Sequence, residues 1–140
     1  MRVLLDTCVI IDTLQNRSPF STDSNNIFLY AANELFNGFI TAKSVTDIYY
    51  LVHKSTHDIT KTKAVVNKLF SLFDCLDTAG IDCKKAILST TSDYEDAVMI
   101  ETALRNEIDC IVTRNERDFS KSPVKIYTPK QFIELLTKDL

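Results

Sequence analysis

The sequence predicts an α/β fold in which a central parallel sheet is covered by helices on both faces. Short apolar strands alternate with longer segments whose apolar residues recur at helical spacing, which is the pattern of a parallel sheet. The stretch at residues 109–113 has no polar interruption until its end, as expected of a strand buried on both faces. No repeat, low-complexity tract or linker divides the chain, so we expect residues 1–140 to form a single domain.

The chain opens with a short strand and a short helix. Residues 2–5 form an apolar run of strand length, and a second apolar run predicts a helix over residues 7–14. Either Asp6 or Thr7 can serve as the N-cap of this helix. The polar stretch at residues 15–26 then predicts a loop.

The rest of the N-terminal half predicts three helices and one strand. Apolar residues at helical spacing predict a helix over residues 27–36, which the Asn-Gly pair at residues 37–38 caps. A strand at residues 39–42 follows. The next two helices are expected to begin at Ser44 and at Asp58 or Thr60.

The C-terminal half repeats the alternation with shorter strands. Strands are predicted at residues 74–77, 109–113 and 124–127. Helices are predicted around residues 86–88, over residues 94–107 and from Pro129 onward. The helix over residues 94–107 has the clearest amphipathic pattern of this half, which indicates a helix packed on the sheet.

Composition narrows the class of protein. The chain is 45% hydrophobic and 25% charged, so it is more apolar than a disordered chain. Its net charge of -3 does not indicate electrostatic attraction of nucleic acid by the molecule as a whole. The four cysteines form no CxxC pair, so we expect reduced, buried thiols rather than a zinc site. No signal peptide and no run of ~20 apolar residues is visible, which predicts a cytoplasmic protein without membrane contact.

Asp6 is the most informative residue, because it directly follows a buried strand. At the carboxyl edge of a parallel sheet, its side chain points to the place where open α/β folds bind ligands. Comparable positions, at strand ends and helix starts, are held by Asp47, Asp93, Asp96, Asn115 and Asp118. We therefore expect Asp6, Asp96 and at least one of Asp47, Asn115 or Asp118 to line one pocket.

Such a cluster of acids indicates a metal-dependent nuclease. Carboxylates close together repel one another unless a cation offsets their charge. Magnesium prefers hard oxygen ligands, and a metal site can activate water and stabilise the leaving oxygen of a phosphodiester. The competing explanation is that Asp47, Asp58 and Asp93 are only helix caps. That explanation is weakest for Asp6, because capping does not require an acid directly after a buried strand.

Two other kinds of site match the sequence less well. His53 and His57 are four residues apart, a spacing that can bind zinc on one helix face, but the segment lacks the Glu of the metalloprotease motif. A receiver-like phosphoacceptor site also places acids around magnesium. A site of that kind requires two acids directly after the first strand, where this chain has only Asp6. It also requires a Lys near the position that Arg114 holds.

Three segments resemble the PIN domain family. Residues 3–12 read VLLDTCVIID, which looks like the LDTNVLLD-like opening of PIN domains. Residues 94–97, YEDA, resemble the family's EDA segment, and residues 111–119, IVTRNERDF, resemble its TRN/D-x-x-DF segment. The segments occur in the family's order, and the resemblance spans residues 2 to about 133.

The resemblance implies a three-layer α/β/α sandwich and a ribonuclease that uses Mg²⁺ or Mn²⁺. Many small bacterial members are VapC-like toxins that a separate antitoxin neutralises, and many are dimers. The resemblance therefore implies RNA as substrate and an antitoxin as partner, and it leaves a homodimer open. By position, Asp6 matches the family's first acid and Asp96 its third.

The sequence departs from the family at the second and fourth acids. The second is usually Glu, and here it is the shorter Asp47; the fourth is often Asp, and here it is Asn115, which leaves Asp118 as the remaining acid. The catalytic residues implied are Asp6, Asp47, Asp96 and Asp118. The metal ligands implied are Asp6, Asp96, Asn115 and Asp118, while Thr7, Thr113 and Arg114 are expected to orient water or phosphate. The alternative is a catalytically degenerate PIN-like module that binds RNA or protein.

Overall fold

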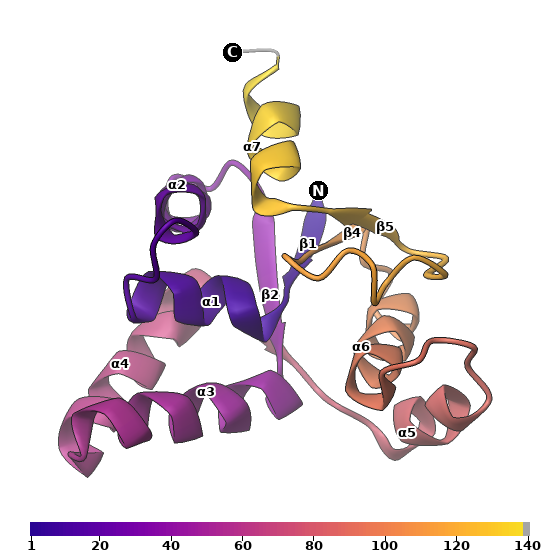
Figure 1. Cartoon of the computed structure of the whole chain (residues 1–140), viewed down its shortest axis with the longest axis horizontal. Helices are drawn as coiled ribbons and strands as arrows, with labels where there is room; N and C mark the ends of the chain where they lie inside the picture. Colours follow the sequence, from indigo (N-terminus) through magenta and orange to yellow (C-terminus); the bar gives the residue numbers. More distant parts are fainter. Residues whose placement is uncertain (139–140) are drawn as a thin grey trace.

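The computed structural model describes residues 1–138 and contains the predicted parallel sheet. Its strands are β1 (Arg2–Leu5), β2 (Asn37–Thr41), β3 (Asp74–Leu76), β4 (Cys110–Val112) and β5 (Lys125–Tyr127). The strand order is β3-β2-β1-β4-β5, and every neighbouring pair is parallel (Figure 1). From the central β1 the chain adds β2 and then β3 on one side, and it then places β4 and β5 on the other side of β1. The strand order therefore reverses between β1 and β4. Open α/β folds bind ligands at such a switch point.

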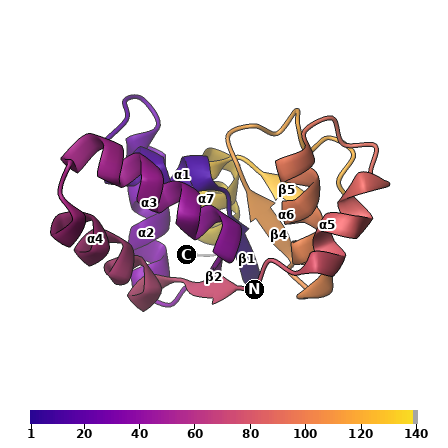
Figure 2. The same ribbon diagram turned by 90° about the horizontal axis from the view of Figure 1, so that it is seen from below.

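Helices cover both faces of the sheet, which confirms the predicted sandwich (Figure 2). They are α1 (Thr7–Leu14), α2 (Ser21–Ala32), α3 (Ala42–Thr56), α4 (Ile59–Leu72), α5 (Gly80–Ile87), α6 (Tyr94–Arg105) and α7 (Pro129–Thr137). Val3 and Leu5 join a core with α1, α2, α3, α4 and α7, whereas Leu4 joins a second core with α6. This alternation follows from the two-residue period of a strand, so β1 carries apolar side chains on both faces.

The segment at residues 15–38 differs from the sequence prediction. The expected loop ends early, because α2 begins at Ser21, and the helix expected to reach residue 36 stops at Ala32. The Asn-Gly pair is not a helix cap but forms the first two residues of β2, where the Asn37 N–H donates to the Met1 carbonyl at 2.9 Å. A Cβ on Gly38 would lie 2.6 Å from the Phe73 ring. Close approach of an aromatic ring, rather than a turn, therefore accounts for this glycine.

Smaller differences lie at the ends of elements. Helix α3 begins at Ala42 with Thr41 as N-cap, so it starts before the expected Ser44, and α4 uses Asp58 as N-cap. The expectation of buried cysteines is right for Cys110 but wrong for Cys75, which is exposed; all four cysteines are free. Within residues 1–138, no helix combines the length and apolar character needed to cross a bilayer.

Candidate active site

Asp6 is the first residue after β1 and lies at the switch point of the sheet. Its backbone N–H donates to the Val112 carbonyl at 3.0 Å, which extends the pairing of β1 with β4 past the end of the strand. Its side-chain Oδ1 accepts the Thr7 backbone N–H at 2.7 Å and so caps α1. Of the two N-caps considered from the sequence, Asp6 is therefore the one that forms. Capping occupies one of its two carboxylate oxygens.

The second carboxylate oxygen of Asp6 receives only neutral donors. The Thr113 hydroxyl donates to Oδ2 at 2.7 Å, and the Cys8 thiol lies 3.5 Å from the same atom. Asp6 is only 7% exposed. Burial raises the pKa of its carboxyl above the usual range, against the hydrogen bonds from Thr113, Thr7 and Cys8, which lower it. Within residues 1–138, Asp6 forms no ion pair.

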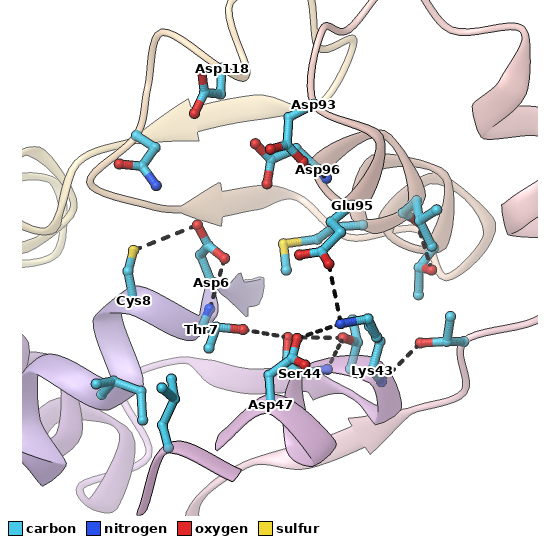
Figure 3. Close-up of a pocket in the computed structure, with 18 of the residues that line it drawn as sticks. Asp6, Thr7, Cys8, Lys43, Ser44, Asp47, Asp93, Glu95, Asp96 and Asp118 are labelled. Carbon is cyan, nitrogen blue, oxygen red and sulfur yellow. Dashed lines mark hydrogen bonds and ion pairs between the residues drawn. The ribbon is translucent and has the colours of Figure 1, made fainter. Parts of the chain in front are cut away.

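Helix α6 brings a second group of acids to the same edge of the sheet. Asp93 is its N-cap and accepts the Asp96 N–H at 3.0 Å. Asp96 therefore lies in the first turn, and its side chain faces the pocket that holds Asp6 (Figure 3). Partial burial raises the pKa of Asp96 to about 7, with further contributions from the charges of Asp6, Asp93, Asp118 and Glu95. The charged groups that act on Asp96 are therefore other acids.

Hydroxyl groups join the starts of α1 and α3. The Thr7 hydroxyl donates to the Ser44 hydroxyl at 3.0 Å. Thr41 caps α3, because its hydroxyl accepts the Ser44 N–H at 3.1 Å, and the Thr41 and Ser44 hydroxyls lie 3.0 Å apart. Thr41 and Ser44 are both buried. This network fixes the beginning of α3, and with it the side chains of the first two turns, next to Asp6.

Lys43 connects α3 to α6 across the pocket. Its Nζ lies 2.6 Å from Oδ2 of Asp47 and 3.6 Å from Oε1 of Glu95 (Figure 3). The hydrogen bond to Asp47 is the main reason why the pKa of Lys43 is raised above its usual value. Asp47 therefore differs from Asp6 and Asp96, since its carboxylate already has a cationic partner.

A pocket of about 470 Å³ joins these groups. Six of the residues predicted for the site line it: Asp6, Thr7, Asp47, Asp96, Asn115 and Asp118. They come from the β1–α1 junction, from α3, from α6 and from the segment after β4. The expected convergence of Asp6 and Asp96 with at least one further group in one pocket is therefore confirmed. Their roles in binding or catalysis remain proposals.

Two residues predicted for this site do not line the pocket. Thr113 is fully buried behind Asp6, donates to its Oδ2 and accepts the Asn115 N–H at 3.0 Å. Arg114 turns toward α1, where its guanidinium forms two hydrogen bonds with the buried carboxylate of Asp12, one of them at 3.1 Å. The same guanidinium lies 3.9 Å from the centre of the Phe20 ring. Arg114 thus anchors the segment that carries Asn115.

Several residues of the pocket are not among those predicted from the sequence, and three of them carry ionisable groups next to the predicted acids: Cys8, Lys43 and Glu95. Lys43 lies one residue before the helix expected to begin at Ser44. Because α3 begins at Ala42 instead, Lys43 and Asp47 are four residues apart on one helix, a spacing that brings side chains together. Glu95 lies inside the YEDA segment but differs from Asp96 in being exposed. Burial and the charge of Asp6 raise the pKa of the Cys8 thiol to about 12, which keeps it neutral.

The donor groups suit a hard divalent cation. Among residues 1–138, no three His, Cys, Asp or Glu side chains lie close enough together to form a complete metal site. Magnesium does not require one, because it keeps several waters and uses one or two carboxylates. Asp6 and Asp96 offer two carboxylates to the pocket, and burial together with the charge of Asp6 raises the pKa of Asp96. Asn115 and Asp118 line the same pocket and offer further oxygen atoms. These residues therefore fit Mg²⁺ or Mn²⁺ better than a softer metal.

The sequence profile of the PIN domain matches residues 2–117, which is most of the chain. The chain belongs to the PIN domain family. This assignment confirms the family predicted from the three sequence segments. No curated protein sequence matched the chain.

Three solved bacterial structures have a similar fold. DNA-bound VapBC from Salmonella typhimurium gives a TM-score of 0.68 at 21% identity, covering 92% of this chain and 98% of that one. A toxin-antitoxin complex from Klebsiella pneumoniae gives 0.66 at 20% identity, covering 91% and 97%. FitAcB from Neisseria gonorrhoeae gives 0.66 at 17% identity, covering 91% and 98%. This PIN domain is therefore similar in fold to VapC-like proteins along nearly its whole length.

Proposed function

We propose that this PIN domain is an endoribonuclease that depends on Mg²⁺ or Mn²⁺ and acts in the cytoplasm as the toxin of a toxin-antitoxin pair. One observation carries the proposal. Asp6 and Asp96 line a common pocket, neither forms an ion pair within residues 1–138, and partial burial together with the charges of neighbouring acids raises the pKa of Asp96. Charge of this kind at a sheet edge favours binding of a cation.

We assign residues of this site roles in metal binding or in positioning the reacting groups. Asp6 and Asp96 are the principal ligands of the metal, and Asp47 adds a ligand directly or through water. Asp118 and Asn115 complete the surroundings of the ion. The bound ion would supply Lewis-acid activation of water and stabilise charge at the phosphodiester. Thr113 holds the Asp6 carboxylate in its orientation, as the 2.7 Å hydrogen bond supports. The Thr7 hydroxyl lines the pocket and can orient water or a phosphate oxygen.

RNA is the proposed substrate, and the pocket supports it in two ways. Its volume of about 470 Å³ has room for a nucleotide with water. Tyr50, which is 64% exposed, lines the same pocket and offers a ring on which a base can stack.

The proposed partner is an antitoxin that covers the acidic pocket. One of the similar structures named above is described as a toxin-antitoxin complex, which supports a partner of this class. An Arg or Lys of the antitoxin would suit the pocket, because it offsets the carboxylates where the metal otherwise binds. Harmless overexpression of a cleavage-competent chain without its antitoxin would contradict the toxin role but not the nuclease.

A degenerate PIN module that binds RNA or protein without cleaving it is the second candidate. The pairing of Asp47 with Lys43 at 2.6 Å favours this candidate, because it occupies the position that matches the family's second acid. Asn115 supports it too, since an amide supplies an oxygen ligand but no charge.

One assay separates the two candidates. The purified chain is incubated with a mixed RNA pool in Mg²⁺, in Mn²⁺ and in EDTA, beside Asp96→Asn and the control Asp74→Asn, whose carboxylate is exposed on β3. If the protein is a nuclease, the wild type and the Asp74 variant should cleave RNA with either metal. Neither should cleave in EDTA, and Asp96→Asn should not cleave under any of these conditions. Metal binding without cleavage by the wild type would favour the degenerate module.

A further inference from the structure

Lys43 is a cation in a pocket that six acidic residues line, and the dipole and side-chain spacing of its helix do not explain its position. It is the second residue of α3, at the positive end of the helix dipole, where a lysine is unfavourable. Its partner Asp47 is four residues further along, so the cation precedes the anion. That order is the weaker orientation for a pair on a helix.

The two contacts of Lys43 point to the pocket instead. Its ammonium lies between carboxylates of different helices, 2.6 Å from Asp47 on α3 and 3.6 Å from Glu95 on α6 (Figure 3). The backbone below it is fixed, because the Lys43 N–H donates to the Thr78 hydroxyl at 3.2 Å and the Thr46 hydroxyl donates to the Lys43 carbonyl at 2.7 Å. The side chain can therefore move while its attachment point stays in place.

This ion pair can be broken at small cost. The side chains of Lys43 and Asp47 are 43% and 41% exposed, and that of Glu95 is 71% exposed. Water and salt weaken pairs with this much exposure. A divalent ion carries twice the charge of an ammonium group and competes for the same carboxylate oxygens.

We propose that Lys43 is the resident cation on the α3 side of the pocket, and that it competes with the divalent ion for Asp47. The inference rests on the proposed metal-dependent function and adds the control of metal affinity by a residue of this chain. Lys43 holds Asp47 while the divalent ion is scarce. Binding of the ion then requires the ammonium to leave Asp47, which raises the metal concentration at which the site fills.

Titration with Mn²⁺ alone, in low-salt buffer without RNA, tests the proposal by calorimetry. Lys43→Gln should bind Mn²⁺ about three- to tenfold more tightly than the wild type, because a competing positive charge is gone. Lys43→Arg keeps the charge and should stay within about twofold of the wild type. The control Lys54→Gln removes an exposed lysine of the same helix that does not line this pocket, and it should change nothing.

A double-variant cycle with Asp47→Asn shows whether Lys43 acts through Asp47. In the Asp47→Asn background, Lys43→Gln should alter the affinity by less than about twofold. An equal gain in both backgrounds, or no gain in the wild-type background, would overturn the inference. Thermal melts without metal confirm that each variant is folded.

The same titration separates this inference from the proposed function. Binding by the wild type that Asp6→Asn abolishes and Lys43→Gln leaves unchanged would overturn the role of Lys43 alone. If neither the wild type nor Lys43→Gln binds Mn²⁺, the inference and the metal-dependent function both fail.

Discussion

Two kinds of buried or half-buried carboxylate occur in this protein, and they differ in their partners. Asp82 is fully enclosed and accepts hydrogen bonds from Arg105, Thr102 and the Ala79 N–H, all at 2.9 Å. Its pKa is lowered, because these contacts outweigh its burial. Asp12 is buried in the same way against Arg114.

Within residues 1–138, no arginine forms an ion pair with Asp6 or Asp96. Hydroxyl, thiol and backbone donors meet Asp6, other acids surround Asp96, and the pKa of each is raised. Asp12 pairs with Arg114, and Asp82 on α5 pairs with Arg105 on α6 and so links these two helices. Asp6 and Asp96 form no ion pair within residues 1–138, and the proposed metal ion would supply their countercharge. An arginine partner therefore distinguishes the structural acids of this fold from the acids proposed to bind metal.

The largest effect is expected from Asp6→Asn. The substitution keeps a capping oxygen for α1 but removes one charge from the proposed metal site. RNA cleavage in Mg²⁺ should fall about a thousandfold, which corresponds to ~4 kcal/mol of activation free energy. The free energy of unfolding without metal should stay the same or rise, because burial disfavours the Asp6 charge. Normal melting together with wild-type cleavage would refute the role of Asp6, and simple unfolding would show that Asp6 is structural.

Asp12→Ala should have the next largest effect, and on stability. It leaves the partly buried guanidinium of Arg114 without its carboxylate, so the free energy of unfolding should fall by about 3 kcal/mol in urea titrations. A double variant, Asp12→Leu with Arg114→Met, should recover most of this loss, because it removes both charges. If Asp12→Ala proved as stable as the wild type, the contrast between the two kinds of acid would not hold.

A smaller effect is expected from pH. The pKa of Asp96 is about 7 in the fold against 3.8 for a free Asp, so the folded state holds more protons between these values. Stability without metal should therefore fall as pH rises from about 4 to about 7, by about 1–2 kcal/mol after allowance for solvent screening. Asp82 does not interfere, because its lowered pKa affects stability only below about pH 4.

Urea unfolding in EDTA at pH 5 and pH 8 measures this dependence. Asp96→Asn should make this dependence less steep and leave the part that the raised pKa of Asp6 contributes. At pH 8, Mg²⁺ should stabilise the wild-type protein by binding the folded state. An equal slope in the wild type and in Asp96→Asn would show that Asp96 is not the group responsible.

Thr113→Val should give the smallest effect. Valine matches the shape of threonine but removes the donor to Asp6 and the acceptor of the Asn115 N–H. We expect a loss of about 1 kcal/mol in the free energy of unfolding. The exposed control Thr22→Val should cost less. If the two variants unfold alike, the hydroxyl does not support Asp6.

The sequence predicted the sheet, most helices and the convergence of acids, because each depends on local pattern. Asp6 could be selected since an acid directly after a buried strand is uncommon, and Asp96 because it begins an amphipathic helix. Tertiary contacts decided the rest. Gly38 appeared to end a helix together with Asn37, but its lack of a side chain makes room for Phe73. Arg114 stands next to Asn115 in sequence, yet its guanidinium turns away to Asp12.

The central position of β1 also determines when the site can form during synthesis. Asp6 directly follows the first strand, but the Thr113 that donates to it comes 107 residues later, and Asp118 follows after that. Contacts of such long sequence separation form late in folding. A nascent chain therefore carries Asp6 long before it can complete the pocket. The ribosome must release residue 118 before this protein can acquire the proposed cleavage activity, and until then the growing chain poses no hazard to the RNA from which it is translated.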